Sequence, residues 1–424
     1  MNILVVGGGG REHAIVRKLK ESPKATKLYC APGNGGIAMD AECVPIKATD
    51  VDGIVAFAST HAIDLVVVTP DDPLMLGMVD ALEAAGIRAF GPVQKAALIE
   101  GSKVFSKDLM KKYGIPTAGY HVFSDPKKAL EFIREQDTYP TVIKADGLAL
   151  GKGVIIAENY AHAKEAIQTI MTDKVFGASG NTVVIEEFLT GPEVSVLCFT
   201  DGKTIVPMVS AKDHKRAFDG DLGPNTGGMG TVSDNPFYTK EIADICMERI
   251  FKPTIDAMNK EGRPFKGCLF FGLMITKNGP VVIEYNARFG DPETQVVLPR
   301  LKSDLVDIFE AVIDEKLDQV PVEWEDCACA CVVMASGGYP GKYETGIPIK
   351  GLGKDGQSPH ATIFHAGTKL VDDKFVTAGG RVLGVTAKGA TVQEALDAAY
   401  RAVDHIHFDG AHYRKDIGRT KPID

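Results

Sequence analysis

The alternation of strand-like and helix-like segments in the first 101 residues constrains the fold most. Apolar runs typical of buried strands lie at residues 3–6, 28–31, 65–68 and 87–90, and helical patterns lie between them. Strands that alternate with helices form a parallel sheet, because each connection returns the chain to the same end of the sheet. We therefore predict a Rossmann-like α/β domain over residues 1–101, with ligands at the carboxyl ends of its strands.

A run of glycines at residues 7–10 separates the first strand from a helix that begins at Arg11. The free N–H groups of a helix N-terminus and the charge of Arg11 together favour a small phosphate group here. A dinucleotide site is the alternative, but its third glycine would fall at Glu12, and no acidic residue ends the second strand. Glycines that serve only tight packing are a further alternative.

The chain of 424 residues is too long for one compact core, and the segments after residue 101 predict two further α+β units. Residues 102–320 predict a two-part domain, in which strand and helix patterns at about 123–188 form a small subdomain. A linker at Pro321 and Val322 then precedes strands and a helix that begins with a capping box at Thr391. We expect residues 321–424 to form a separate cap without a catalytic cluster.

A glycine-rich loop at residues 147–153 joins two expected strands of the subdomain. A P-loop would instead lead into a helix and has a different spacing. The loop is either a mobile hairpin lid that carries Lys152 over a triphosphate or a simple turn. Upstream, Lys103 and Lys107 lie four residues apart in a helical segment, so their side chains share one face.

Two segments near the middle of the chain have the composition of ligand-binding loops. The strand end at residues 186–188 offers a backbone edge to adenine, and Glu193 after the following turn can accept ribose hydroxyls. A solvent-facing acidic hairpin is the alternative. Residues 220–230 form a long loop rich in glycine and proline. A loop of this length without its own secondary structure is usually functional or disordered, and we expect a function.

Glu284 and Asn286 lie two residues apart at the end of an apolar strand. Strand side chains alternate between faces, so these two should point the same way. A carboxylate and an amide oxygen on one face suit Mg²⁺, which binds oxygen ligands. Arg288 just beyond could bind a carboxylate or phosphate through its planar guanidinium. A strand end that runs into a polar loop is the alternative.

Composition argues against several classes of function. The net charge of −9 disfavours nucleic acid as a partner. No apolar run reaches membrane-spanning length, and the chain begins with a strand pattern rather than a signal segment. The cysteines form no disulfide framework, which fits a reducing cytoplasm. Cys327, Cys329 and Cys331 alternate along an expected strand and are read as small buried side chains rather than a metal site.

Together these motifs resemble the phosphoribosylamine–glycine ligase family of ATP-grasp enzymes, over nearly the whole chain. The resemblance rests on GGREHA at 9–14, APGN at 31–34, EGSK at 100–103, KADGLALGKG at 144–153, EEFLTGPE at 186–193, DHKR at 213–216, GPNTGGMG at 223–230 and RFGDPETQ at 288–295. The last segment is specific to this family, whereas the glycine loop is shared by other ATP-grasp ligases. The resemblance implies a pre-ATP-grasp domain, a two-part ATP-grasp domain and a C-terminal cap.

The resemblance also implies roles for individual residues. ATP would be bound by Lys103, Lys144, the lid residues Gly147, Gly151, Lys152 and Gly153, the adenine-binding Glu186, Glu187 and Phe188, and the ribose-binding Glu193. Mg²⁺ or Mn²⁺ would be held by Glu284 and Asn286. The phosphorylated sugar would contact Gly9, Gly10, Arg11, Asn34 and Asp71. Glycine and the transferred phosphoryl group would be surrounded by Asp213, Lys215, Thr226, Gly227, Gly228, Met229 and Arg288.

The implied reaction belongs to purine synthesis. ATP phosphorylates the carboxylate of glycine, and the amine of 5-phosphoribosylamine attacks the acyl phosphate to give glycinamide ribonucleotide, ADP and phosphate. Two departures from the family and superfamily patterns stand out: Asp71 is one methylene shorter than the family's usual Glu, and residues 269–275 offer no acidic second metal ligand. We expect a monomeric cytoplasmic enzyme with small-molecule substrates and no nucleic-acid or membrane partner.

Three rival functions remain at this stage. The first is an ATP-grasp ligase for a different acid, which RFGDPETQ and GPNTGGMG disfavour. The second is a dinucleotide-dependent oxidoreductase, which the incomplete glycine fingerprint disfavours. The third is a nucleotide-binding regulator without activity, which would be expected to have lost Glu284, Asn286 or the lysines, and all are present.

Overall fold

The N-terminal sheet is parallel, as the sequence predicts, and contains one short strand, β3 (Glu42–Cys43), that was not predicted. The computed structural model describes residues 1–148 and 153–419. Its first sheet has the strand order β3-β2-β1-β4-β5, and every pair of neighbours is parallel. The strands are β1 (Asn2–Gly7), β2 (Lys27–Pro32), β3 (Glu42–Cys43), β4 (Leu65–Val68) and β5 (Ala89–Phe90). The helices of this region are α1 (Gly10–Lys20), α2 (Val51–Thr60), α3 (Asp71–Met75), α4 (Met78–Ala84) and α5 (Gln94–Gly101).

The backbone of the turn between β1 and α1 packs closely against the backbone of the turn after β2. A Cβ atom on Gly8 would lie 2.5 Å from the carbonyl oxygen of Gly33, so a side chain would push the two turns apart. Gly9 caps the N-terminus of α1 with extended backbone. The turns after β1 and β2 therefore meet at the carboxyl edge of the sheet, where the parallel fold was expected to bind ligands.

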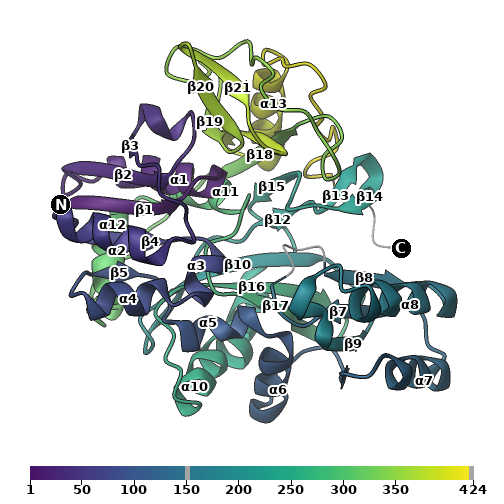
Figure 1. The fold of residues 1–424 in the computed structure, drawn as a ribbon. Helices are drawn as coiled ribbons and strands as arrows, with labels where there is room; N and C mark the ends of the chain where they lie inside the picture. The colour runs from purple at the N-terminus through teal and green to yellow at the C-terminus, as the bar shows by residue number, and fades with distance from the viewer. Residues whose placement is uncertain (149–152, 420–424) are drawn as a thin grey trace.

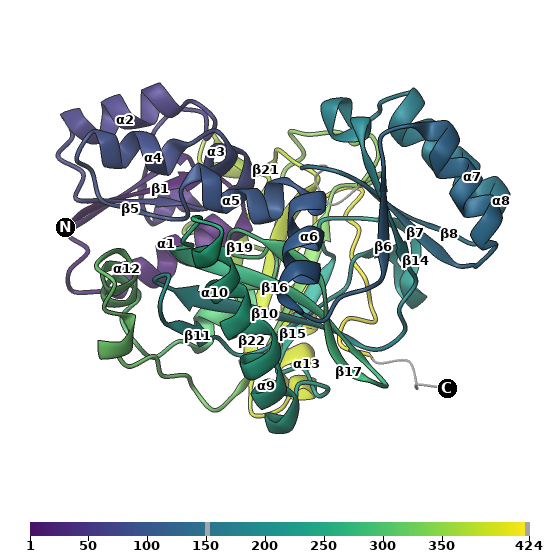
Figure 2. The same ribbon diagram turned by 90° about the horizontal axis from the view of Figure 1, so that it is seen from below.

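The lid subdomain is a small sheet covered on one side by helices. Its strand order is β6-β9-β7-β8, with β6 (Tyr120–Phe123), β7 (Thr141–Ala145), β8 (Val154–Ala157) and β9 (Val183–Glu187). Helices α7 (Pro126–Gln136) and α8 (Tyr160–Ile167) lie together on its outer side (Figure 2). Their apolar faces enclose a separate core that includes Ala129, Ile133, Ile143 and Ile170. This subdomain therefore has a hydrophobic core of its own.

A second sheet lies at the centre of the molecule. Its order is β11-β10-β16-β17, with β10 (Glu193–Thr200), β11 (Ile205–Pro207), β16 (Gly267–Thr276) and β17 (Gly279–Asn286). The associated helices are α6 (Lys103–Tyr113), α9 (Lys240–Cys246), α10 (Lys252–Lys260), α11 (Thr294–Val297) and α12 (Leu305–Ile313). One apolar cluster runs from Val66 and Leu74 of the N-terminal domain to Phe271 and Met258 of this unit. The shared core fixes the two units against each other.

The cap does not form its sheet from its own residues alone. The order is β12-β15-β18-β22-β19, and β12 (Lys212–Asp213) and β15 (Gly230–Ser233) come from the preceding unit. The cap supplies β18 (Ala328–Ala335), β19 (Thr362–His365), the hairpin β20 (Thr368–Val371) and β21 (Lys374–Thr377), β22 (Arg381–Gly389) and α13 (Val392–Val403). Figure 1 shows the cap at the top of the molecule, above α1 and β15. The expected separate cap is therefore joined to the central unit through a continuous sheet.

Local differences from the expected elements have simple causes. The loop at 220–230 was expected to lack secondary structure, yet its residues Leu222–Asn225 form β14, which pairs with β13 (Arg216–Phe218). That pairing depends on a partner strand, which propensity alone does not reveal. The helix expected at 241–259 is present, but a π-helical turn at Met247–Phe251 divides it into α9 and α10. Within the described residues, no helix is both long and apolar enough to cross a membrane.

Candidate functional site

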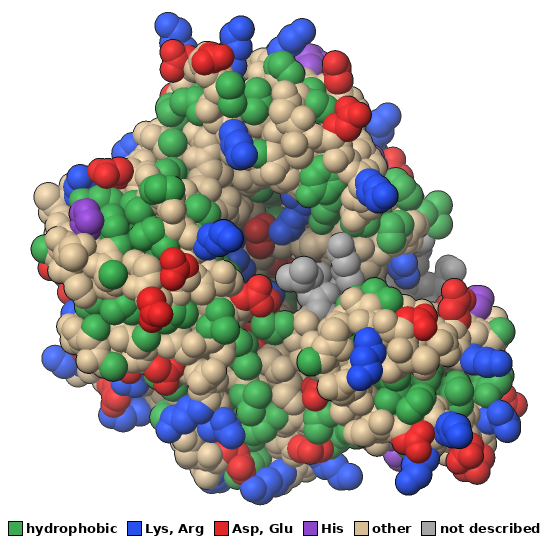
Figure 3. All heavy atoms as spheres, in the orientation of Figure 1, with side chains coloured by type: hydrophobic (Ala, Val, Ile, Leu, Met, Phe, Trp, Pro, Cys, Tyr) green, Lys and Arg blue, Asp and Glu red, His purple; other side chains and the backbone are tan. Residues whose placement is uncertain are grey.

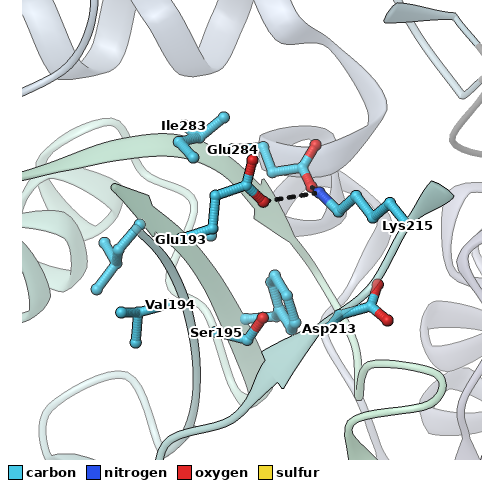
Figure 4. Close-up of a pocket in the computed structure, with 10 residues that line it drawn as sticks. Glu193, Val194, Ser195, Asp213, Lys215, Ile283 and Glu284 are labelled. Carbon is cyan, nitrogen blue, oxygen red and sulfur yellow. Dashed lines mark hydrogen bonds and ion pairs between the residues drawn. The ribbon is translucent and has the colours of Figure 1, made fainter. Parts of the chain in front are cut away.

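The units surround a hollow in which acidic and basic side chains gather. Figure 3 shows this hollow at the centre of one face, between the N-terminal domain, the cap and the lid subdomain. A pocket within it is lined by Glu193, Val194, Ser195, Asp213, Lys215, Phe270, Gly272, Leu273, Ile283 and Glu284 (Figure 4). Residues predicted for ribose, metal and phosphoryl binding are thus brought to one place by β10, β12 and β17.

Lys215 joins the two carboxylates of this pocket. Its Nζ lies 3.3 Å from Glu284 Oε1 and 3.8 Å from Glu193 Oε2. Lys215, with further help from Lys144 and Lys103, lowers the pKa of Glu284 to about 2. Glu284 is therefore ionised at any working pH, and its negative charge faces a cluster of ammonium groups. Such a carboxylate is already charged when a cation binds. The ammonium groups around it can also attract the negative charge of a polyphosphate.

Glu100 connects the end of β17, the strand that carries Glu284 and Asn286, to Arg288. Its carboxylate accepts hydrogen bonds from Asn286 Nδ2 at 3.0 Å and Ala287 N–H at 2.7 Å, and it pairs with Arg288 Nη2 at 3.0 Å. Burial raises the pKa of Glu100, while Arg288 counteracts this. Burial acts to lower the pKa of Arg288, but Glu100 and then Asp71 raise it, which brings Asp71 into the same electrostatic group.

Glu100 was not predicted as a site residue, although it begins the EGSK segment at 100–103. That segment is the only sequence feature that indicates a role for Glu100, because its partner Arg288 lies at the other end of the ATP-grasp unit in the sequence. Arg288 Nε is buried and lacks a hydrogen-bond partner in the described structure. Since an unpaired buried donor is costly, this atom is a candidate contact for an anionic ligand.

Two lysines converge on Glu186 beneath the lid. Lys107 Nζ and Lys144 Nζ each lie 3.0 Å from Glu186 Oε2. Burial lowers the pKa of Lys107 to about 8, although Glu186 opposes that shift. Glu186 Oε1 is buried without a hydrogen-bond partner in the described residues, so it can accept from a ligand donor such as an exocyclic amine. Lys107 had been noted on the same helix face as Lys103 but had been given no role.

The neighbouring strand end differs from the predicted adenine edge in one respect. Glu187 N–H donates to the carbonyl oxygen of Gly119 at 3.0 Å. Strand β9 ends at Glu187, and the half-exposed Phe188 follows it. A backbone contact with adenine would therefore use the chain just after β9.

Lys103 contacts the start of the glycine-rich loop. Its Nζ donates to the carbonyl oxygen of Gly147 at 2.8 Å, and Asp146 Oδ1 accepts from Ser102 Oγ at 3.1 Å. At the other end of the loop, Gly153 O accepts from Ala145 N–H at 2.8 Å. The predicted contacts of Gly151 and Lys152 lie outside the described residues. The loop's base is thus tied to the helix that carries Lys103.

The glycine turn of the N-terminal domain contacts the RFGDPETQ segment. Arg11 Nη1 donates to Phe289 O at 3.1 Å, and Arg11 Nε lies 2.6 Å from Glu12 Oε1. Glu12 also accepts from Gly9 N–H at 2.7 Å. A Cβ on Gly10 would lie 2.6 Å from Gln295 Nε2. Gly9, Gly10 and Arg11 therefore lie where two units meet.

Asn34 has a different environment from the one predicted. Its Nδ2 donates to Gly8 O at 3.0 Å and to His365 O at 2.7 Å. Its Oδ1 accepts from the N–H groups of Gly36 and Ile37 at 3.0 and 2.9 Å. The amide already has these protein partners, so this arrangement favours a role in shaping the turn over a direct ligand contact.

The loop at 226–229 packs against Asp213. Thr226 Oγ1 donates to Lys215 O at 2.8 Å and accepts from Gly228 N–H at 3.0 Å. Gly228 has φ of 119°, and a Cβ there would lie 2.7 Å from Asp213 Oδ1. Met229 is fully buried and anchors the loop. Burial and then the charge of Glu293 raise the pKa of Asp213 well above its usual range, while Lys215 opposes that shift.

Glu284 and Asn286 on β17 fit a divalent cation whose remaining ligands come from a bound substrate. No group of three or more His, Cys, Asp or Glu side chains suited to a metal occurs in residues 1–148 and 153–419. A site with one carboxylate and one amide is incomplete for zinc but suits Mg²⁺, which usually binds one or two carboxylates together with phosphates. Asn286 donates through Nδ2 to Glu100, which orients its oxygen relative to Glu284.

Comparison with known proteins assigns this arrangement to a family. Family models for phosphoribosylglycinamide synthetase match in three parts: the N domain over residues 1–100, the ATP-grasp (A) domain over 101–294 and the C domain over 329–420. The chain belongs to the phosphoribosylglycinamide synthetase family. This confirms the resemblance and the fold class drawn from the sequence.

Individual relatives of the phosphoribosylglycinamide synthetase family agree over the full length. The phosphoribosylamine–glycine ligase of Caldanaerobacter subterraneus is 49% identical over 98% of this chain and 99% of its own. The crystal structure of the Thermotoga maritima ligase has a TM-score of 0.85 at 34% identity and covers 99% and 100% of the two chains. The MgADP-bound biotin carboxylase domain from Hydrogenobacter thermophilus has a TM-score of 0.73 at 14% identity, over 97% and 91%, which shows a shared fold.

Proposed function

We propose that this protein joins glycine to 5-phosphoribosylamine with ATP, giving glycinamide ribonucleotide, ADP and phosphate in purine biosynthesis. The observation that carries the proposal is the meeting of the RFGDPETQ segment with the N-terminal glycine turn, through Arg11 and Phe289. That contact joins the turn, which binds the sugar phosphate in this proposal, to the segment that begins with Arg288. Family membership and relatives of about 49% identity over nearly the full chain support the same substrates.

ATP is bound between the lid subdomain and the central sheet in this proposal. Lys144 and Lys103 attract the phosphates. Glu193, the first residue of β10, borders the pocket and accepts hydrogen bonds from the ribose hydroxyls. The open acceptor Glu186 Oε1 can take a hydrogen bond from the adenine amine. Mg²⁺, or Mn²⁺ in its place, would be held by Glu284 and Asn286 and would neutralise charge on the phosphates.

Glycine is activated at the loop of residues 226–229. Lys215 and Arg288 offset the charge of the carboxylate and of the transferred phosphoryl group, which allows the carboxylate oxygen to attack phosphorus. The product of this step is a glycyl phosphate. Closure of the lid excludes water and protects that acyl phosphate from hydrolysis.

The amine of 5-phosphoribosylamine then attacks the glycyl carbonyl. The turn at Gly9, Gly10 and Arg11 holds the sugar phosphate, and Asp71 lies toward the sugar. Asp213 is placed to interact with the glycyl amine, and release of phosphate completes the amide. The protein acts as a monomer in the cytoplasm in this proposal.

One omission assay tests the proposed function. Purified protein should release ADP only when glycine, freshly prepared phosphoribosylamine, ATP and Mg²⁺ are all present. The amide product should form in equal amount to ADP. Equal ADP release without glycine, or release that another amino acid supports better, would refute the assignment.

A further inference from the structure

We propose that Arg381, in the C-terminal cap, is a positioning residue for the acceptor site. Its guanidinium fixes the backbone of the glycine-site loop and the side chain of Asp291, and so links the glycine site to the sugar-phosphate turn. This inference rests on the proposed function and extends it to a unit that carries no expected catalytic cluster.

The guanidinium of Arg381 contacts the backbone of two segments that are distant in sequence. Its Nη1 donates to Gly227 O at 2.8 Å, to Gly228 O at 3.4 Å and to Asp291 O at 2.9 Å. Its Nη2 lies 3.3 Å from Asp291 Oδ2. These contacts cross 90 residues or more, so the cap holds both segments in one arrangement.

Glycine at position 227 makes this approach possible. A Cβ there would lie 3.0 Å from the central carbon of the Arg381 guanidinium. On the other side, the N–H of Gly227 donates to Tyr339 Oη, also in the cap, at 3.1 Å. The cap therefore binds both the carbonyl and the N–H of one residue in the loop that packs on Asp213.

The local structure of the cap aims Arg381 at this loop. Arg381 begins β22 directly after Gly379 and Gly380, and a register shift separates its pairing with Ala335 from the rest of the ladder. Such an irregularity redirects a side chain at the end of a strand. A Cβ on Gly380 would collide with the ring of Tyr339 at 2.3 Å. Glycine at position 380 therefore allows Tyr339 to lie beside the start of β22, where Arg381 is.

Asp291 carries the contact to the N-terminal domain. A Cβ placed on Gly9 would lie 3.4 Å from Asp291 Oδ2, so this carboxylate borders the sugar-phosphate turn. Its Oδ1 accepts from Gln295 Nε2 at 2.8 Å, and the same amide lies beside Gly10. Although burial acts to raise it, Arg381 and then Arg11 lower the pKa of Asp291. The pair is ionised and connects the two substrate regions.

A positioning role predicts a specific kinetic pattern. The loop carbonyls and Asp291 would lose their fixed donor in Arg381→Ala, whereas the ATP-binding residues on β7, β9 and α6 contact none of these groups. The KM for glycine and the KM for phosphoribosylamine should both rise, by about tenfold or more, while the KM for ATP stays within about twofold. Arg381→Lys should recover only part of the loss, because one ammonium cannot reach all the acceptors.

The experiment compares Arg381→Ala, Arg381→Lys, Tyr339→Phe and the exposed cap control Arg401→Ala. Steady-state kinetics are measured for each substrate, with nucleotide binding and thermal melting as checks of folding. Millimolar guanidinium should restore part of the activity of Arg381→Ala and leave that of Arg401→Ala unchanged. If Arg381→Ala fails to fold, Tyr339→Phe still tests the loop contact and should raise the KM for glycine by several-fold.

Unchanged KM values for glycine and the amine in Arg381→Ala, or in Tyr339→Phe when Arg381→Ala does not fold, would overturn the inference. An equal rise for all three substrates would do the same, since it would indicate a general structural effect. The wild-type reaction separates this inference from the proposed function. If wild-type protein does not require glycine and phosphoribosylamine, the proposed function has failed; if it does and the variants behave normally, only the role of Arg381 has failed.

Discussion

Glu284 Oε1 lies 3.3 Å from Lys215 Nζ, so the carboxylate that we propose as a metal ligand already faces a cation of the protein. Both side chains border the same pocket; Glu284 belongs to β17, and Lys215 lies in the short connection between β12 and β13. Because Lys215 and its neighbouring lysines hold the pKa of Glu284 at about 2, this carboxylate needs no deprotonation before it receives Mg²⁺. The positive charge of Lys215 therefore offsets the negative charge of Glu284 before substrates bind, and it can offset substrate charge afterwards.

Removal of the Glu284 carboxylate should abolish turnover. We expect Glu284→Ala to lower kcat by more than about a hundredfold, since a charged group at the reacting phosphates is lost. The fold should remain, because the side chain borders the pocket rather than the core. Circular dichroism and thermal melting serve as the control for folding. Near-normal kcat with intact folding would show that the metal residues have been placed wrongly.

Glu100 should be important for both stability and catalysis. In Glu100→Ala the buried guanidinium of Arg288 loses its partner, which we expect to cost about 3 kcal/mol in the free energy of unfolding. Urea denaturation measures that loss. Glu261→Ala, which removes an exposed pair with Lys112, is the matched control and should change stability far less. Equal effects in the two variants would contradict the buried role of Glu100.

Arg11 should matter more for the amine substrate than for ATP. Loss of one charged hydrogen-bond donor predicts a rise of about tenfold to a hundredfold in the KM for phosphoribosylamine in Arg11→Ala. The KM for ATP should be nearly unchanged, because the contacts of Arg11 are with Glu12 and Phe289 and not with the residues proposed to bind ATP. Arg17→Ala, on the same helix, is the control. An unaltered KM for the amine would argue against a phosphate contact.

Lys107 should give ATP binding a dependence on alkaline pH. Burial lowers its pKa to about 8, so its ammonium loses a proton as the pH rises through this value. Glu186 would then draw more strongly on Lys144 and leave less positive charge for the phosphates. The KM for ATP should therefore rise between pH 7.5 and 9. Lys107→Arg stays charged throughout and should flatten this rise, whereas the exposed Lys111→Arg should not.

Local sequence patterns determined much of this protein. The apolar runs predicted a parallel sheet and four of its strands, and strand alternation predicted that Glu284 and Asn286 share one face. The helix that carries Lys103 and Lys107 was also predicted, and its ends have local causes: Ser102 Oγ accepts from Phe105 N–H, and Gly114 adopts a left-handed conformation. Such features depend on neighbours within a few residues, and the sequence contains those neighbours directly.

Only the tertiary structure decided how distant segments combine. Strand β14, the joining of β12 and β15 to the cap, and the partners of Glu100 and Arg381 all depend on contacts across many tens of residues. Asn34 illustrates the difference: its motif predicts a ligand contact, and only the structure shows that its amide also bonds to Gly8 and His365. A single sequence states which groups are present, whereas burial and pairing between units decide which of those groups remain available to a substrate.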